Sequence, residues 1–265
     1  MTIKPLIIAH RGASAQAPEN TLVAFRRALA DGADGIELDV RVARDSVPVI
    51  FHDANLRRTA MREGRLSDFT SQELAKIRVG AWFNLKFPKR ARADYLNVTI
   101  PTLAELFDLM RANKLPIYVE LKCENGNHRR LAQAVAGEIK NFDFRNRIVI
   151  KSFNHDAAGE VKRLIPEIKT AALFAPRPMR VLNPSNALVL PALHLDAEEI
   201  SLHYSLATER AVQKASDADL KTVIWTANHS AWVRRAVRLG IYGIITNNPA
   251  RLLAKRDQIL AGVQI

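Results

Sequence analysis

Short apolar runs recur along the chain, and most are followed by a stretch with helical periodicity. Such runs, when bounded by turn residues, predict buried strands, and apolar positions spaced three and four apart predict amphipathic helices. Eight strands are predicted at residues 6–9, 35–40, 117–122, 148–152, 170–174, 193–196, 222–226 and 243–246, with a hairpin return at 47–52. The main predicted helices cover residues 21–30, 102–113, 128–141, 155–164, 206–218, 231–239 and 249–260.

Strands that alternate with helices indicate parallel pairing through right-handed crossovers. Eight such units in 265 residues favour an α/β fold of the (β/α)8 TIM barrel type, with an open doubly wound sheet as the alternative. Residues 54–100 contain no βα unit, so we expect a small insertion after the second strand, packed over one mouth of the barrel. We therefore interpret residues 1–265 as one domain.

The composition narrows the classes of partner. The formal net charge is +12, but the basic residues are scattered and form no nucleic-acid motif, so we expect solvated basic faces or attraction of an anionic substrate. The single Cys123 can form no internal disulfide and is interpreted as structural. No signal peptide or spanning segment is evident, which predicts a soluble cytoplasmic protein without stable membrane insertion. A homo-oligomer is not excluded.

Polar side chains gather at the carboxyl ends of the predicted strands, where TIM barrels carry their active sites. Glu37 and Asp39 lie two residues apart within an apolar frame, which places them on one face of a strand. The other charged or titratable residues at these ends are His10, Arg11, His52, Glu120 and Lys122. Successive strand ends therefore bring carboxylates, cations and histidines to one mouth of the barrel.

Each residue type in this group suggests a chemical role. Three carboxylates without sulfur or histidine ligands suit a hard divalent cation, Mg²⁺ or Ca²⁺. Arginine and lysine suit a phosphate group, and two histidines suit an acid–base pair near neutral pH. Alternatively, a single strand-end histidine is more often a structural hydrogen-bonding group, and Glu37 and Asp39 could pair with a buried arginine. Their coincidence on successive strands favours phosphoryl-ester chemistry.

A series of motifs resembles the glycerophosphodiester phosphodiesterase family, in the family's order and from residue 8 to about 250. The motifs are AHRGASAQAPENT, GIELDV, VPVIFHD, IPTLAEL, VELK, KSFN, WTAN and GIITNNP. The resemblance implies a (β/α)8 barrel that hydrolyses a small anionic phosphodiester, with a divalent cation, to glycerol 3-phosphate and an alcohol. It also implies site roles. Glu37, Asp39 and Glu120 would hold the metal, His10 and His52 would be the acid–base pair, Arg11 and Lys122 would contact the phosphate, Trp225 would wall the pocket, and Glu19 would orient this corner.

Three positions depart from the family pattern. Asp45-Ser46 stands where Asp-Gly is usual, Ala60 replaces a threonine, and Asn247 replaces an aspartate at the end of the last strand. None of them removes a proposed ligand or histidine, so they affect the expected substrate more than the reaction. A phosphodiester that carries a sugar in place of glycerol therefore stays open.

Two further interpretations concern function and specificity. The alternative to an enzyme is a catalytically silent barrel that binds a phosphorylated ligand, and the intact histidines and carboxylates argue against it. Substrate choice would depend on Trp82 and Phe83 of the insertion and on Trp225, although the first two residues could equally serve only to pack the insertion on the barrel.

Overall fold

The structure is a computed structural model that describes residues 4–124, 126–176 and 186–262. Its strands are β1 Leu6–His10, β2 Gly35–Val42, β3 Pro48–Ile50, β4 Ile117–Leu121, β5 Ile148–Ser152, β6 Lys169–Phe174, β7 Glu199–His203, β8 Lys221–Trp225 and β9 Gly243–Thr246. They pair in the order β1-β9-β8-β7-β6-β5-β4-β2-β3, and a further pairing of β1 with β2 closes the sheet. All pairs are parallel except the β2–β3 hairpin. The predicted (β/α)8 barrel is thereby confirmed.

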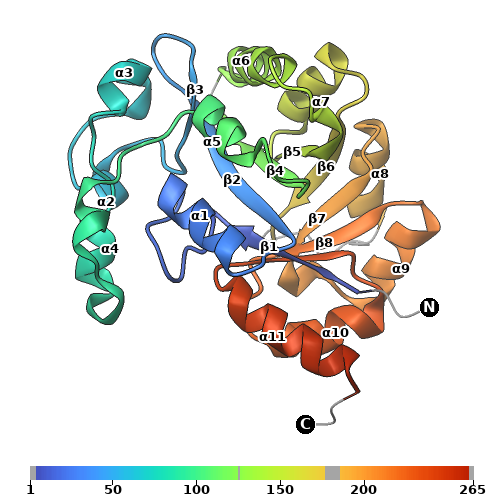
Figure 1. Ribbon diagram of the computed structural model, residues 1–265. Coiled ribbons are helices and arrows are strands. Elements are labelled where there is room, and N and C mark those ends of the chain that lie inside the picture. The colour runs from blue at the N-terminus through green and yellow to red at the C-terminus, as the bar shows by residue number, and fades with distance from the viewer. Residues whose placement is uncertain (1–3, 125, 177–185, 263–265) are drawn as a thin grey trace.

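Helices surround this barrel (Figure 1). They are α1 Leu22–Ala30, α2 Arg57–Ala60, α3 Ser71–Leu74, α4 Ala81–Lys86, α5 Leu103–Met110, α6 His128–Lys140, α7 His155–Leu164, α8 Asn186–His194, α9 Glu209–Asp217, α10 Ala231–Leu239 and α11 Pro249–Leu260. Several begin at residues that the sequence marks as caps. The Thr102 side chain, for example, accepts a hydrogen bond from Glu105 N, and the Glu105 side chain accepts one from Thr102 N. None of the described helices is long and apolar enough to cross a bilayer.

The short helices α2, α3 and α4 lie between β3 and α5, to one side of the barrel near α1 (Figure 1). They form no βα unit. This segment has its own apolar cluster, which includes Leu56, Leu66 and Leu74. A second cluster joins Phe83 of α4 to Ala24 of α1, and it attaches the segment to the barrel.

The predicted strand at residues 193–196 is wrong. Helix α8 continues to His194, and the barrel strand in this part of the chain is β7, which begins at Glu199. Ile200 and Leu202 of β7 belong to the apolar layer between sheet and helices. Glu199 instead points into the barrel, where it accepts a hydrogen bond from Tyr118 Oη at 3.3 Å. A charged residue on the inner face interrupts the apolar run by which the other strands are recognised.

Candidate active site

The inner face of the barrel changes from apolar to charged along its strands. Ile8, Tyr118, Val149, Val223 and Ile245 form an apolar cluster in the interior. Two residues further along the same strands, the side chains are polar or aromatic: His10, Glu120, Lys151, Trp225 and Asn247. Because successive residues of a strand alternate between its faces, these side chains also point inward, at the carboxyl-terminal end of the barrel. This is the end at which a TIM barrel carries its catalytic residues.

Three carboxylates lie together in this layer. Glu37 and Asp39 of β2 are completely buried, and Glu120 of β4 is 6% exposed. Asp39 and Glu120 are paired neighbours in the sheet, and an oxygen from each of the three carboxylates lies within 4.8 Å of the others. Among the described residues, this is the one group of histidine, cysteine and acidic side chains close enough to hold a metal ion.

The donor set fits the divalent cation that the sequence predicts. Glu37 Oε1 and Asp39 Oδ1 are buried and accept no hydrogen bond of good geometry, although each lies near a lysine ammonium. Lone pairs are therefore available on two of the oxygens. Carboxylate oxygens without sulfur or histidine are the ligands that Mg²⁺ and Ca²⁺ prefer.

Arg11 and Lys122 contact this group from the solvent side. Arg11 Nε lies 2.9 Å from Asp39 Oδ2, and Lys122 Nζ lies 3.1 Å from Asp39 Oδ1 and also contacts Glu120. Burial alone would raise the pKa of Asp39, but the charges of Arg11 and Lys122 outweigh it and hold that pKa well below its ordinary value. The side chains of Arg11 and Lys122 are 16% and 14% exposed, so both remain accessible to an anion.

Lys151 is a further cation in this layer, and the sequence analysis assigned it no role. Its side chain is 1% exposed, and its Nζ lies 2.8 Å from Glu37 Oε1 and 3.7 Å from Glu120 Oε2. Burial would raise the pKa of Glu37, but the charge of Lys151 is the main influence that lowers it below the ordinary value. Burial raises the pKa of Glu120, and the two lysines offset this only in part.

His10 is held by an amide. Its Nδ1 lies 2.6 Å from Asn247 Oδ1, an oxygen that also accepts a hydrogen bond from Ser14 Oγ at 3.2 Å. Because a carbonyl oxygen can only accept, His10 donates from Nδ1, and its Nε2, 3.9 Å from Glu37, carries the lone pair of the neutral ring. Burial lowers the pKa of His10, and the charge of Glu37 offsets this only in part. Burial therefore favours the neutral form of the ring.

His52 is held by a carboxylate. Its Nδ1 lies 2.7 Å from Asp53 Oδ1, and Arg58 Nε donates to Asp53 Oδ2 at 2.6 Å. Burial would raise the pKa of Asp53, but the hydrogen bonds from His52 and Arg58 lower it to about 2. The Asp53 carboxylate therefore fixes the orientation of the His52 ring. His52 and Lys122 line one shallow hollow of about 530 Å³ at the barrel mouth.

The Pro18-Glu19-Asn20-Thr21 segment connects these groups. Glu19 accepts hydrogen bonds from Arg11 Nη1 at 2.7 Å and from Arg58 Nη2 at 2.8 Å. Asn20 donates from Nδ2 to Asp39 Oδ2 at 2.8 Å, a contact that sequence reasoning missed. Thr21 caps α1 by accepting a hydrogen bond from Ala24 N.

Gly12 explains how the chain leaves β1 beside the site. Its φ is +77°, and a Cβ there would lie 2.5 Å from the carbonyl carbon of Ala24. Such a distance allows only glycine, since the left-handed backbone and the close approach to α1 both disfavour a side chain. Arg11 can therefore turn back toward Asp39 directly after the strand ends.

Trp225 ends β8 in a group of aromatic rings. Its ring centroid is 5.6 Å from that of Phe153 and 5.3 Å from that of His203, and its Nε1 donates to Ser201 O at 3.2 Å. Lys122 Nζ lies 5.9 Å from the Phe153 ring centroid. Phe153 is 48% exposed and contacts both Trp225 and Lys122, and the sequence analysis gave it no role.

The two insertion aromatics differ in environment. Phe83 is completely buried and packs against Tyr95, which makes it part of the contact between α4 and the barrel. Trp82 is only partly buried, and the Arg58 guanidinium lies 5.9 Å from its ring centroid. Arg58 also contacts Asp53, the carboxylate that holds His52, so a chain of contacts connects Trp82 to His52.

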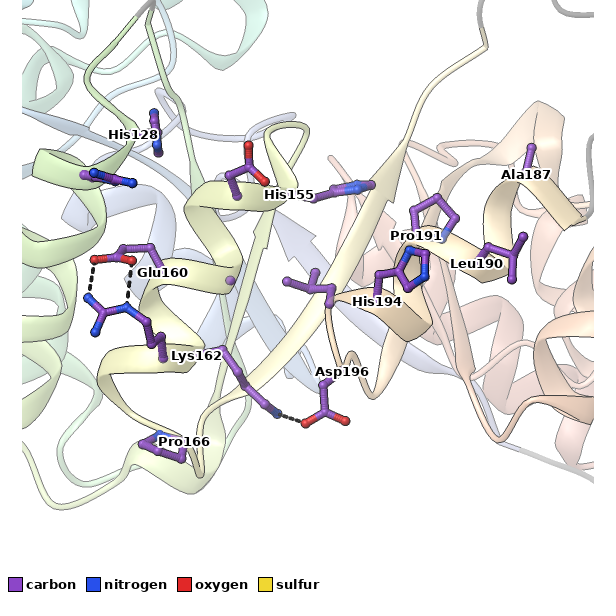
Figure 2. A pocket seen from close by; sticks show the side chains of 15 residues that line it. His128, His155, Glu160, Lys162, Pro166, Ala187, Leu190, Pro191, His194 and Asp196 are labelled. Carbon is purple, nitrogen blue, oxygen red and sulfur yellow. Dashed lines mark hydrogen bonds and ion pairs between the residues drawn. The ribbon is translucent and has the colours of Figure 1, made fainter.

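A separate hollow of about 1040 Å³ lies outside the barrel, bounded by α6, α7 and α8 (Figure 2). His128, His155 and His194 line it, each at the end of a different helix. Figure 2 shows the three rings spread along the hollow. His155 Nε2 lies 3.3 Å from Leu173 O, and the three histidines form no group of the compactness found for the carboxylates. The described residues that line this hollow therefore form no metal site of their own.

Comparisons with known proteins agree with this geometry. The model of the glycerophosphoryl diester phosphodiesterase family matches residues 10–251. A glycerophosphodiester phosphodiesterase of Caldanaerobacter subterraneus subsp. tengcongensis is 33% identical over 95% of this chain and 97% of the relative. One from Bacillus altitudinis is 30% identical over 96% and 98%.

A solved structure extends the likeness to three dimensions. A phosphodiesterase of Oleispira antarctica, in complex with its product sn-glycerol-3-phosphate, matches with a TM-score of 0.84 and 28% identity, over 96% of this chain and 97% of that one. The family match covers every strand end that carries the residues described above. The chain therefore belongs to the glycerophosphoryl diester phosphodiesterase family and is an enzyme of the phosphodiester hydrolase class.

Proposed function

We propose that this protein hydrolyses a glycerophosphodiester to sn-glycerol 3-phosphate and an alcohol, and that the reaction depends on a divalent cation. The main support is the buried group of Glu37, Asp39 and Glu120, whose oxygens lie within 4.8 Å of one another beside two accessible cations. The sn-glycerol-3-phosphate in the Oleispira antarctica relative supports the same product.

The accessible cations bind the phosphate in this proposal. Arg11 and Lys122 meet at Asp39 and both reach solvent, so a phosphodiester anion can contact both of them. A divalent cation bound by the three carboxylates supplies Lewis-acid polarisation of a phosphoryl oxygen. Trp225 and Phe153 wall the side beyond Lys122, where the remainder of the substrate meets apolar surface.

The hydrogen-bond partners of the histidines suggest separate roles. His10 donates from Nδ1 to Asn247 and so presents a free Nε2 lone pair, which suits the general base. His52 is oriented by the Asp53 carboxylate, which Arg58 holds in turn, and a ring fixed in this way at the mouth of the barrel suits the general acid.

The bond changes follow from these roles. An oxygen nucleophile, either a neighbouring substrate hydroxyl or water, forms a bond to phosphorus while His10 takes its proton. The bond from phosphorus to the alcohol oxygen breaks, and His52 protonates that oxygen. With a substrate hydroxyl as the nucleophile, water then opens the resulting cyclic phosphate.

The test is release of sn-glycerol 3-phosphate from glycerophosphocholine, measured with and without EDTA and after addition of Mg²⁺ or Ca²⁺. We expect EDTA to abolish turnover and one of the cations to restore it. Asp39→Asn should remove activity, whereas the surface control Asp108→Asn should not, since Asp108 lies on α5 and pairs with the exposed Arg111. Full turnover in EDTA would refute the cation dependence.

The substrate itself needs a second arm of the same experiment. Turnover is compared across a panel of phosphodiesters that includes sugar phosphodiesters, and the preferred member identifies the alcohol. The panel also tests whether Asn247, which departs from the family pattern, goes with a sugar in place of glycerol. Binding of sn-glycerol 3-phosphate without cleavage of any member of the panel would refute the proposed glycerophosphodiester substrate.

A further inference from the structure

We propose that Lys151 is a fixed counter-charge that weakens and tunes cation binding by the three carboxylates, so that the site accepts one divalent ion. The inference rests on the cation site proposed above and concerns a residue outside it. Lys151 lies on β5, next to Glu120 in the sheet register, and its side chain contacts Glu37 and Glu120. It therefore acts on the ligands rather than on the substrate.

Burial distinguishes Lys151 from the other cations of the site. Its side chain is 1% exposed, whereas those of Arg11 and Lys122 are 16% and 14% exposed. Lys122 follows the last residue of β4 and has solvent on one side, so its ammonium can leave Asp39 for a phosphate. Lys151 is enclosed within the barrel, and moving its ammonium away from Glu37 would leave a buried charge without a partner. We therefore expect the Lys151 ammonium to stay beside Glu37 when a cation or a substrate binds.

A charge count shows the consequence. The carboxylates of Glu37, Asp39 and Glu120 carry three negative charges when ionised, and the fixed charge of Lys151 leaves two, which matches a single divalent ion. The accessible cations Arg11 and Lys122 then face the anionic substrate. Without Lys151, the same three carboxylates would attract a cation more strongly and would keep more negative charge near the phosphate.

The experiment is calorimetric titration of the cation-stripped, substrate-free protein with Mg²⁺ and with Ca²⁺. Because Lys151 contacts two of the three carboxylates, we expect Lys151→Met to bind the cation at least about tenfold more tightly than the wild type. Lys162→Met is the matched control. Lys162 is 14% exposed and paired with Glu198 at 2.7 Å, far from the triad in the fold, and its replacement should leave cation affinity unchanged.

The direction of the change separates this role from a structural one. A lysine that merely holds the carboxylates in place would weaken cation binding when replaced, because the ligands would lose their orientation. Weaker or unchanged affinity in a folded Lys151→Met variant would overturn the proposal. If the wild type binds no cation, the proposed function fails, whereas a wild type that binds while the variant shows no gain refutes only this inference.

A second measurement needs no variant. In a crystal structure of the wild type with Ca²⁺ bound, Lys151 Nζ should remain within hydrogen-bond distance of Glu37, while Lys122 Nζ should have moved away from Asp39. Displacement of Lys151 from Glu37, with Lys122 still on Asp39, would show that Lys151 is not the fixed charge. This outcome decides the proposal even if Lys151→Met does not fold.

Discussion

Replacing Glu199 by glutamine should stabilise the protein at high pH. Glu199 begins β7 at the end of the barrel opposite the site, is 4% exposed, and accepts one hydrogen bond from Tyr118, while its Oε2 has no hydrogen-bond partner among the described residues. Burial raises its pKa from the ordinary 4.5 to about 7, and the hydrogen bond from Tyr118 and the charges of Lys221 and Lys169 offset this only in part.

The sign and size of the effect follow from proton linkage. Between pH 4.5 and about 7 the folded protein keeps a proton on Glu199 that the unfolded chain has released, so the contribution of Glu199 to stability is present below pH 4.5 and is lost as the pH rises through 7. The gap between the two pKa values, at about 1.36 kcal/mol per unit, corresponds to about 3 kcal/mol. Glutamine imitates the protonated acid and has no charge to bury.

The assay is urea unfolding, followed by circular dichroism, at a series of pH values from 5 to 8.5. The free energy of unfolding of Glu199→Gln should be close to that of the wild type near pH 5 and should exceed it by about 3 kcal/mol near pH 8. Glu198→Gln is the control for loss of a negative charge at the same strand end, because Glu198 instead pairs with Lys162 on the outside. The reasoning would be refuted if the difference in free energy of unfolding between Glu199→Gln and the wild type did not grow with pH. It would also be refuted if the difference grew equally for Glu198→Gln.

Three further predictions concern the site and its surroundings. His10→Ala and His52→Ala should each lower kcat/KM by roughly 10² to 10⁴-fold, with cation affinity retained. The loss for His52→Ala should be smaller with an activated leaving group than with an unactivated one, and equal losses would contradict the acid role. Gly12→Ala should lower the free energy of unfolding by about 1–3 kcal/mol in a thermal or urea melt, because the new Cβ meets the α1 backbone at 2.5 Å, and an unchanged melting temperature would exclude that clash. Trp82→Ala should change relative kcat/KM across a panel of phosphodiesters more than activity on bis(p-nitrophenyl) phosphate, whereas a uniform fall with a lower melting temperature would indicate packing only.

Most of the barrel could be predicted because its strands have two apolar faces. Glu37 and Asp39 were recognisable as inward-facing from their spacing of two within such a strand, and Glu120 and Lys122 repeat the pattern. β7 was missed because only Ile200 and Leu202 are apolar there, while the inward positions are polar. In the sequence, a strand whose inward positions are polar resembles a loop, because only its outward positions are apolar.

The contacts of the site could be predicted only in part. Lys151 was visible as a strand end, but its pairing with Glu37 depends on the register that places β5 beside β4. Asn20 was visible within its motif, yet its hydrogen bond to Asp39 needs a left-handed backbone with φ of +57° that brings the loop back to β2. Strand alternation determines which face a side chain occupies, but it does not determine which partner on a neighbouring strand it meets.

Two buried carboxylates of the barrel interior, Glu37 and Glu199, have pKa values shifted in opposite directions, and their neighbours explain the difference. Glu37 and Glu199 are both nearly inaccessible, but Lys151 lies 2.8 Å from Glu37 whereas Glu199 has a tyrosine hydroxyl as its hydrogen-bond partner. The pKa of Glu37 is lowered and that of Glu199 is raised to about 7, so only Glu37 remains an anion across the neutral range. A cation ligand must be ionised before the cation arrives, since a protonated carboxyl has little affinity for it. The lysine that keeps Glu37 ionised also repels the incoming cation, and the tighter binding expected of Lys151→Met requires that the relief of this repulsion outweighs the easier protonation of Glu37 in the variant.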